Sequence, residues 1–477
     1  MSAENRAEIA RTEAKSATLR KELRLGDLVL LQVLLIVGLP WIGYAARQGG
    51  TQIVLWLAGL ALFYLPLAGA VIYLSRRMPL EGGVYQWVKA GLSPFAGYMA
   101  GWSLTVTAIC FFASVGSMLA NGFAYAGGVP GSWMAVSKPF ALTLTALACL
   151  ITFAMNVRGL HAAKWLSGAG SLLMITTFLL LLYLLMRAWV TGTPSNRSSF
   201  SLAWPGFSIL TLNVFTKMAL GALSGFDNSA VFSEECRKPE NDVARSVLIA
   251  APLIAFIYIL GTLAVLAYVP PAAVDLAATV PQVLQAGFGV TALGRALTSI
   301  AVYGFNVYLT AAMVIFVGMV ARLPMVAGWD GLLPAWWSQL HPKFRTPYKA
   351  IAAVTATLLV LGVLSLLGAA NQEAVQLSSA ISIGSLCIMY MLLFAVILFG
   401  FRQRPERPGI AIRLGALAAF LVAFASLIFE ILPLGDVASP ALFALKVGGT
   451  ICAANGLGAF LYWRGTRLLR RISAIGC

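Results

Sequence analysis

The chain has 477 residues, of which 60% are hydrophobic and only 10% are charged, against about 25% charged residues in soluble domains. This composition excludes an ordinary soluble enzyme. The net charge of +16 does not indicate a nucleic-acid partner, because the basic residues cluster between apolar segments. Twelve such segments are each long enough to cross the hydrocarbon core of a bilayer, which takes roughly 20 helical residues. Because lipid cannot satisfy backbone polar groups, and barrel strands are much shorter, the sequence predicts an all-α integral membrane protein.

The predicted spans follow a polar tail at residues 1–25 and precede a basic tail at 465–477. In chain order they cover residues 27–48, 52–75, 94–125, 138–156, 163–189, 207–233, 245–269, 292–323, 349–368, 376–400, 411–432 and 441–463. The six cysteines are scattered without a CxxC pair and there are only two histidines, so we expect no metal site and no cofactor.

The basic residues are distributed unequally between the two sides of the predicted membrane. If the N-terminus is cytoplasmic, the cytoplasmic segments hold 26 of the 33 lysines and arginines. The outer segments hold four, namely Arg47, Lys138, Arg187 and Arg197. This asymmetry is typical of the positive-inside rule. We therefore expect a multi-pass protein of the cell membrane with both termini in the cytoplasm.

Two spans contain helix-breaking residues at mid-depth. The first span is interrupted at Gly38, Leu39 and Pro40, directly before Trp41, and proline cannot donate to the helical ladder. The sixth span carries the run Gly221, Ala222, Leu223, Ser224, Gly225, Phe226 and Asp227. Broken helices at matching positions of two halves indicate the central site of a transporter, where exposed helix N-termini attract an anionic group. The alternative is that both are ordinary kinks.

Several motifs resemble those of the amino acid–polyamine–organocation (APC) permease superfamily. They lie at residues 25–31, at 81–88 (Glu-Gly-Gly-Val-Tyr-Gln-Trp-Val), at 94–102, at 225–239 and at 330–347. The resemblance implies a leucine-transporter-like core of ten helices at 26–400, built as a five-plus-five inverted repeat with helices 1 and 6 broken. Residues 401–464 would then add two further transmembrane helices.

The resemblance also implies where a substrate binds. The site would lie between spans 1, 3, 6, 8 and 10 and include the two broken segments, with Phe226 and Phe316 covering the substrate as gates. Three departures from the family pattern stand out. Pro40 removes a backbone donor from the first break, and Met174 stands where proton-coupled relatives carry a lysine. Arginine–agmatine exchangers carry a gating tryptophan just before the sixth-span break, and the corresponding position here is close to Gly221.

Ionisable residues inside spans are costly and often mark a transport pathway. Asp227 follows the sixth-span break, where it would either meet a cationic substrate or cap the helix that restarts there. Lys217 lies ten residues earlier. It would attract a substrate carboxylate, carry a coupling proton, or extend its ammonium group to the outer vestibule. Glu430 is expected at the membrane interface, at the outer end of span eleven.

Span eight carries four polar residues on one predicted helical face: Ser299, Tyr303, Asn306 and Thr310. They would either line the substrate pathway or join neighbouring helices through hydrogen bonds.

These observations favour a secondary active permease that moves an amino acid by alternating access, coupled to an ion gradient or to exchange. The expected partners are a small-molecule substrate, the lipid bilayer and a coupling ion, H⁺ or Na⁺. The sequence lacks the nucleophile, metal-hydrolase and nucleotide-binding motifs of common enzymes. Two alternatives stay open: a polyamine or organic cation permease or exchanger, and a membrane sensor that does not transport.

Overall fold

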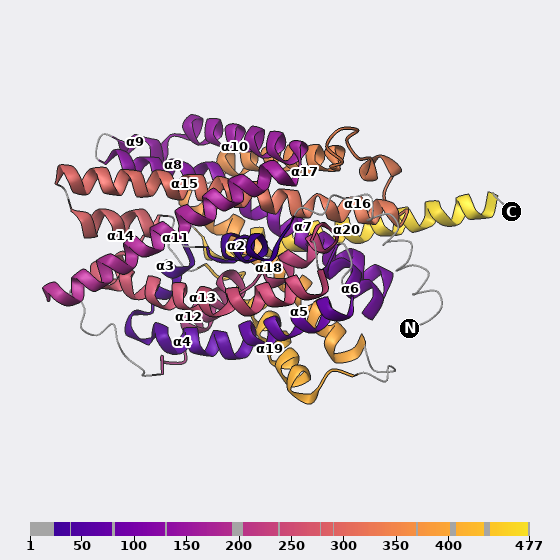
Figure 1. Cartoon of the computed structure of the whole chain (residues 1–477), viewed down its shortest axis with the longest axis horizontal. Helices are drawn as coiled ribbons and strands as arrows, with labels where there is room; N and C mark the ends of the chain where they lie inside the picture. Colours follow the sequence, from indigo (N-terminus) through magenta and orange to yellow (C-terminus); the bar gives the residue numbers. More distant parts are fainter. Residues whose placement is uncertain are drawn as a thin grey trace.

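The computed structural model describes residues 23–38, 40–78, 82–128, 131–192, 204–236, 239–276, 278–289, 291–368, 371–400, 407–433 and 439–475. Over these ranges the chain forms a bundle of helices (Figure 1), and its extended backbone pairing is an isolated parallel β-bridge between Leu23 and Cys236. The prediction of an all-α membrane protein is confirmed.

Eleven helices in the described part of the chain are long and apolar enough to cross a membrane, and the first predicted span adds the shorter apolar helix α2. The first six spans are α2 (Leu25–Ile36) with α3 (Pro40–Ala46); η1 (Gly49–Thr51), α4 (Gln52–Gly59), η2 (Leu60–Tyr64) and α5 (Leu65–Arg77); α7 (Pro94–Ala113) with α8 (Val115–Gly127); α10 (Lys138–Arg158); α11 (Leu160–Thr191); and α12 (Ile209–Thr216), η5 (Lys217–Ala222) and η6 (Phe226–Glu235). The other six are α13 (Pro239–Tyr268); α15 (Ala292–Val320) with α16 (Arg322–Trp329); α17 (Tyr348–Gly368); α18 (Asn371–Ala395) with η9 (Val396–Gly400); α19 (Ile410–Phe429); and α20 (Pro440–Ile475).

Short helices connect the spans at both ends of the bundle: α6 (Val84–Gly91), α9 (Trp133–Val136), η7 (Pro271–Ala273), α14 (Thr279–Phe288) and η8 (Ala335–Ser338). In Figure 1, α6, α16 and the projecting end of α20 lie at one end of the bundle, and α9 and α14 lie at the other. The segments that the charge pattern assigns to the cytoplasm thus share one end of the molecule.

The first span is interrupted between α2 and α3, as the glycine and proline predict. Two tyrosines from other spans satisfy the backbone groups that the break leaves unpaired. Tyr258 of α13 accepts a hydrogen bond from Gly38 N at 3.0 Å and donates one to Ile36 O at 2.6 Å. Tyr308 of α15 donates to Val37 O. The break is therefore a supported feature of the fold and not a frayed helix end.

The sixth span is interrupted between the π-helix η5 and the 3₁₀-helix η6. Gly225 in this gap has φ of +116°, a conformation that L side chains rarely adopt. A Cβ atom at this position would lie 2.9 Å from Asn228 Nδ2 and 3.0 Å from Ile36 Cγ1. Glycine is therefore required here by both backbone conformation and space.

The two broken spans contact each other near the centre of the bundle, where α2 lies (Figure 1), through η6 on one side of the breaks and η5 on the other. Buried Gln32 of α2 donates a hydrogen bond to Ser229 Oγ of η6 at 3.0 Å and another to Ser246 Oγ of α13 at 2.8 Å. These contacts hold the first, sixth and seventh spans together and place both breaks at one site.

Candidate functional site

A cavity of about 100 Å³ lies between the two helix breaks. Since a cavity needs only about 10–15 Å³ of such volume to hold one water molecule, this space is large enough for a small solute. Its wall is formed by the first, third, sixth, eighth and tenth spans, together with Ala278 and Pro281 at the start of α14. The cavity thus lies among the five spans between which the sequence predicts a substrate site.

Six of the residues predicted to bind substrate line this cavity: Gly38, Trp41, Gly221, Ser224, Gly225 and Phe316. The aromatic ring of Phe316 also packs against Phe112 of α7, with ring centroids 5.8 Å apart. Leu39 and the side chain of Pro40 lie outside the described residues.

Four other predicted residues, Ala222, Leu223, Phe226 and Asp227, are fully buried and do not line the cavity. Phe226, which was expected to cover the substrate as a gate, packs its ring against Tyr64 of the second span with centroids 4.8 Å apart. Ser224 and Gly225 lie in the gap before η6 and line the cavity, whereas Phe226 is the first residue of η6 and is directed towards the second span.

The aromatic surface beside the sixth-span break belongs to Trp41 of the first span. A Cβ atom on Gly221 would lie 2.9 Å from Trp41 Cη2, so the indole ring occupies the space that a side chain at Gly221 would need. Trp41 also lies beside Phe111 of α7, with centroids 6.4 Å apart. Gly221 is close to the position at which arginine–agmatine exchangers carry a gating tryptophan. In this protein the glycine leaves that space to Trp41 of the first span.

The polar groups of the cavity wall are uncharged. Ser224 and Asn228 supply a hydroxyl and an amide beside the sixth-span break. Thr107 of α7 and Ser382 of α18 join the third and tenth spans, since Thr107 Oγ1 donates to Ser382 O at 3.2 Å and Ser382 Oγ donates to Thr107 O at 2.9 Å. Among the described residues that line the cavity, none is an acid, a lysine, an arginine or a histidine.

Asp227 contacts the cavity wall through Tyr390 of α18. Tyr390 lines the cavity and donates a 2.7 Å hydrogen bond to Asp227 Oδ1. The other carboxylate oxygen, Asp227 Oδ2, is buried without a hydrogen-bond partner in the described part of the chain. Sequence reasoning singled out the acid but missed Tyr390, whose surroundings in the tenth span carry no break or charge.

The four polar residues of the eighth span, predicted either to line the pathway or to join helices, do not line the cavity in this structure. Tyr303 is 47% exposed on the outside of the bundle. Ser299 and Asn306 donate to the carbonyl oxygens of Ala126 and Leu119 in α8, at 2.9 and 3.4 Å. Thr310 Oγ1 donates to Asn306 O of its own helix at 3.0 Å.

The eighth span instead turns a mainly apolar face to the cavity, formed by Phe305, Tyr308, Leu309, Ala312 and Phe316. Sequence reasoning passed over this face because its residues resemble those of any buried membrane helix. The spacing that marks a polar face cannot tell which neighbour that face meets.

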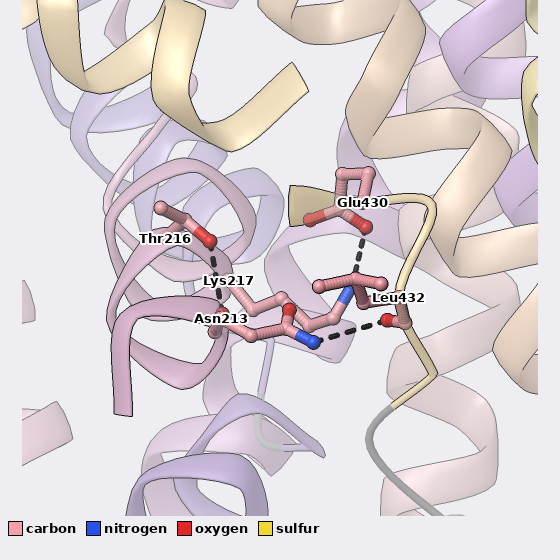
Figure 2. Close-up of polar contacts among 5 residues, drawn as sticks. All are labelled: Asn213, Thr216, Lys217, Glu430 and Leu432. Atoms are coloured by element: carbon pink, nitrogen blue, oxygen red, sulfur yellow. Dashed lines mark hydrogen bonds and ion pairs between the residues drawn. The ribbon is translucent and has the colours of Figure 1, made fainter. Parts of the chain in front are cut away.

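Lys217 and Glu430 form a buried ion pair, which corrects two expectations. The Lys217 side chain is 7% exposed and that of Glu430 is fully buried. Figure 2 shows Lys217 Nζ directed at the Glu430 carboxylate. Lys217 therefore does not extend to the outer vestibule, and Glu430 is not interfacial. Neither residue lines the cavity. Their distance of 213 positions along the chain explains why the sequence does not reveal the pair.

Within the described residues, no group of three or more histidine, cysteine, aspartate or glutamate side chains is arranged to hold a metal ion. The site is therefore described by its helix breaks, its neutral hydrogen-bonding groups and its aromatic wall.

Comparison with known proteins identifies the family. The amino acid permease family profile matches residues 26–449. An uncharacterized transporter of Legionella pneumophila is 23% identical over 82% of this chain and 83% of its own length. The low-affinity putrescine importer PlaP of Escherichia coli is 26% identical over 66% of each chain. The crystal structure of MhsT in complex with L-phenylalanine matches with a TM-score of 0.60 and 18% identity, over 93% of this chain and 99% of MhsT.

The structural similarity to MhsT confirms the leucine-transporter-like fold. The family match confirms the resemblance to the APC superfamily, and with it a permease that crosses the membrane several times. From its fold and its sequence, the chain belongs to the amino acid permease family of the APC superfamily.

Proposed function

We propose that this protein is a secondary active transporter that moves a neutral, apolar amino acid across the cell membrane by alternating access. The substrate binds in the cavity between the two helix breaks. Transport is coupled to an ion gradient or to exchange of solutes, and both termini lie in the cytoplasm. The family supports transport of a small solute, and the chemistry of the cavity supports the substrate class.

The observation that carries the proposal is a cavity between two helix breaks whose described lining residues include no charged side chain. Each break brings together the C-terminus of one helix, where the dipole is negative, and the N-terminus of the next, where it is positive. An amino acid carries an ammonium and a carboxylate group on neighbouring atoms. Partial charges of both signs can therefore satisfy this zwitterion without a formal counter-charge.

The rest of the cavity wall favours an apolar side chain on the substrate. Trp41, Phe111, Phe112, Phe305 and Phe316 contribute aromatic surface, and binding sites for small apolar groups are typically lined in this way. A second charge on the substrate would have to be buried without a partner, which is costly.

A polyamine is the second candidate, since one of the relatives is a putrescine importer. A polyamine carries two or more positive charges and no carboxylate. Asp227 does not line the cavity, and its carboxylate is hydrogen-bonded to Tyr390, which does. A polyamine therefore fits this cavity less well than a zwitterion does.

Uptake into proteoliposomes tests the proposal. Labelled L-leucine, L-phenylalanine, L-lysine, L-glutamate and putrescine would be supplied with and without a pH or sodium gradient. We expect saturable uptake of the two apolar amino acids, each competing with the other, and little uptake of the charged solutes. Uptake of putrescine without leucine or phenylalanine would contradict the proposed substrate class. Protein-free liposomes and the Gly225→Leu variant serve as controls.

A further inference from the structure

Two polar contacts, one buried and one partly buried, join the outer half of the sixth span to the end of the eleventh span (Figure 2). The first is the ion pair between Lys217 and Glu430. In the second, Asn213 Nδ2 donates a 3.0 Å hydrogen bond to Leu432 O. Asn213 and Lys217 are four residues apart and thus lie on one face of the helix. The eleventh span therefore contacts this helix through two successive turns.

Lys217 lies at a special point of the sixth span, because it is the first residue of the π-helix η5. In this segment the hydrogen bonding shifts by one residue, so that Leu223 N donates to Met218 O, at 3.3 Å. π-Helical turns are rare and frequently occur at functional sites. The same short helix ends directly before the break and carries Gly221, which lines the cavity against Trp41.

A buried ion pair is a costly way to join two helices. Desolvation of both charges offsets much of their attraction, and apolar side chains of similar volume often stabilise a fold as well or better. In some proteins a buried polar or ionic group fixes the register of packed helices, because only one arrangement brings its partners together. Glu430 Oε1 is also buried without a hydrogen-bond partner among the described residues. An unsatisfied buried polar atom lowers the stability of the fold, so the pair does not maximise stability.

We propose that Lys217 and Glu430 are a positioning pair for substrate binding, with the eleventh span as the anchor that holds the π-helix and the cavity wall at residues 221–225 in register. The inference rests on the proposed function, since it assigns these two residues a role in the affinity of that site. It also gives a role to the eleventh span, which lies outside the ten-helix repeat.

Charge-swap variants distinguish an effect of the ion pair on helix register from an effect of side-chain packing on substrate affinity. The four proteins are wild type, Lys217→Met, the double variant Lys217→Met/Glu430→Gln, and the swap Lys217→Glu/Glu430→Lys. Uptake of L-leucine into proteoliposomes gives KM and the maximal rate for each. We expect the double variant to raise KM by about tenfold, equivalent to ~1.4 kcal/mol, with a smaller change in maximal rate. The swap should return KM to within about threefold of wild type, which is less than 1 kcal/mol.

The single variant is the harshest, because it leaves Glu430 buried and unpaired, so reduced insertion is expected for it alone. Lys138→Met is the matched control, since it removes the same group at an exposed position. A wild-type KM for the double variant would overturn the proposal. So would a swap variant that is as impaired as the double variant, because only packing would then matter.

A second measurement does not depend on transport. Ser224→Cys places a thiol in the cavity wall, and the rate at which a small methanethiosulfonate reagent converts this thiol to a mixed disulfide, with release of methanesulfinate, reports the position of the break. We expect neutralisation of the pair to change this rate and the swap to restore it, relative to proteins without the added cysteine. If the wild type takes up no amino acid, the proposed function fails, while an unchanged rate of thiol modification overturns the positioning role separately.

Discussion

Tyr390 of the tenth span and Asp227 of the sixth-span break are joined by a 2.7 Å hydrogen bond from the phenol to the carboxylate. Tyr390 forms part of the cavity wall and Asp227 does not. The acid therefore contacts the cavity wall through the aromatic residue. From this arrangement we expect Asp227 to orient the phenol and not to act as a counter-charge for the substrate.

Substitution of Asp227 tests that distinction. Asparagine keeps an oxygen that accepts from Tyr390, so Asp227→Asn should change the KM for an amino acid by less than about threefold. Tyr390→Phe removes the donor and leaves a buried carboxylate unsatisfied, a penalty of about 1–3 kcal/mol, and it should impair uptake much more. Measured uptake of both variants checks this. An Asp227→Asn protein without any uptake would mean that the negative charge itself is needed.

The Gly225 position should tolerate no side chain. Its φ of +116° and the 2.9 Å approach to Asn228 Nδ2 mean that Gly225→Ala strains the backbone and Gly225→Leu also intrudes on the first break. We expect a reduction of uptake of more than about tenfold for alanine and complete loss for leucine, a step of at least ~1.4 kcal/mol. Quantification of protein in the membrane separates lost transport from lost insertion.

Gly69 in α5 provides the matched control, because a Cβ atom there would meet nothing within 4 Å. Gly69→Ala should leave uptake at the wild-type rate. Normal uptake by Gly225→Leu would show that the sixth-span break is not the site.

Gly221 and Trp41 should behave as a coupled pair. Gly221→Ala places a methyl group 2.9 Å from the indole, so the ring must move into the cavity and compete with the substrate. We expect KM to rise in Gly221→Ala and to recover partly in Gly221→Ala/Trp41→Phe, because the smaller ring leaves room. Contacting residues typically show non-additivity of about 0.5–3 kcal/mol in such a cycle. Strictly additive effects would indicate that the two positions act separately.

The orientation in the membrane follows from the charge distribution and can be tested by cysteine labelling. Ala273 and Lys343 are both exposed and lie in loops predicted on opposite sides. An impermeant thiol reagent should label Ala273→Cys in intact cells and Lys343→Cys only after permeabilisation. The parent protein, with its own cysteines, sets the background. Labelling in the reverse order would invert the predicted topology.

Much of the fold could be predicted from the sequence because lipid imposes a simple requirement. Each crossing needs a long apolar helix with its backbone bonded internally, so hydropathy alone located the spans. Glycine and proline mark breaks by local chemistry, since Pro40 lacks a donor and Gly225 tolerates a positive φ. For that reason the first and sixth spans could be recognised as broken, and Gly38, Trp41, Gly221, Ser224 and Gly225 beside the breaks line the cavity. Phe316, which also lines it, was indicated by the family resemblance alone.

The direction in which a side chain points from a helix, and the partner it meets, depended on the tertiary structure. Phe226 and Ser224 are two positions apart, yet one packs against Tyr64 and the other lines the cavity. Lys217 was expected to attract the substrate, carry a proton or extend to solvent. In the structure it pairs with Glu430, which lies 213 positions further along the chain. No local pattern encodes such a pair, because its energy comes from burying two opposite charges together, which happens only when the helices pack.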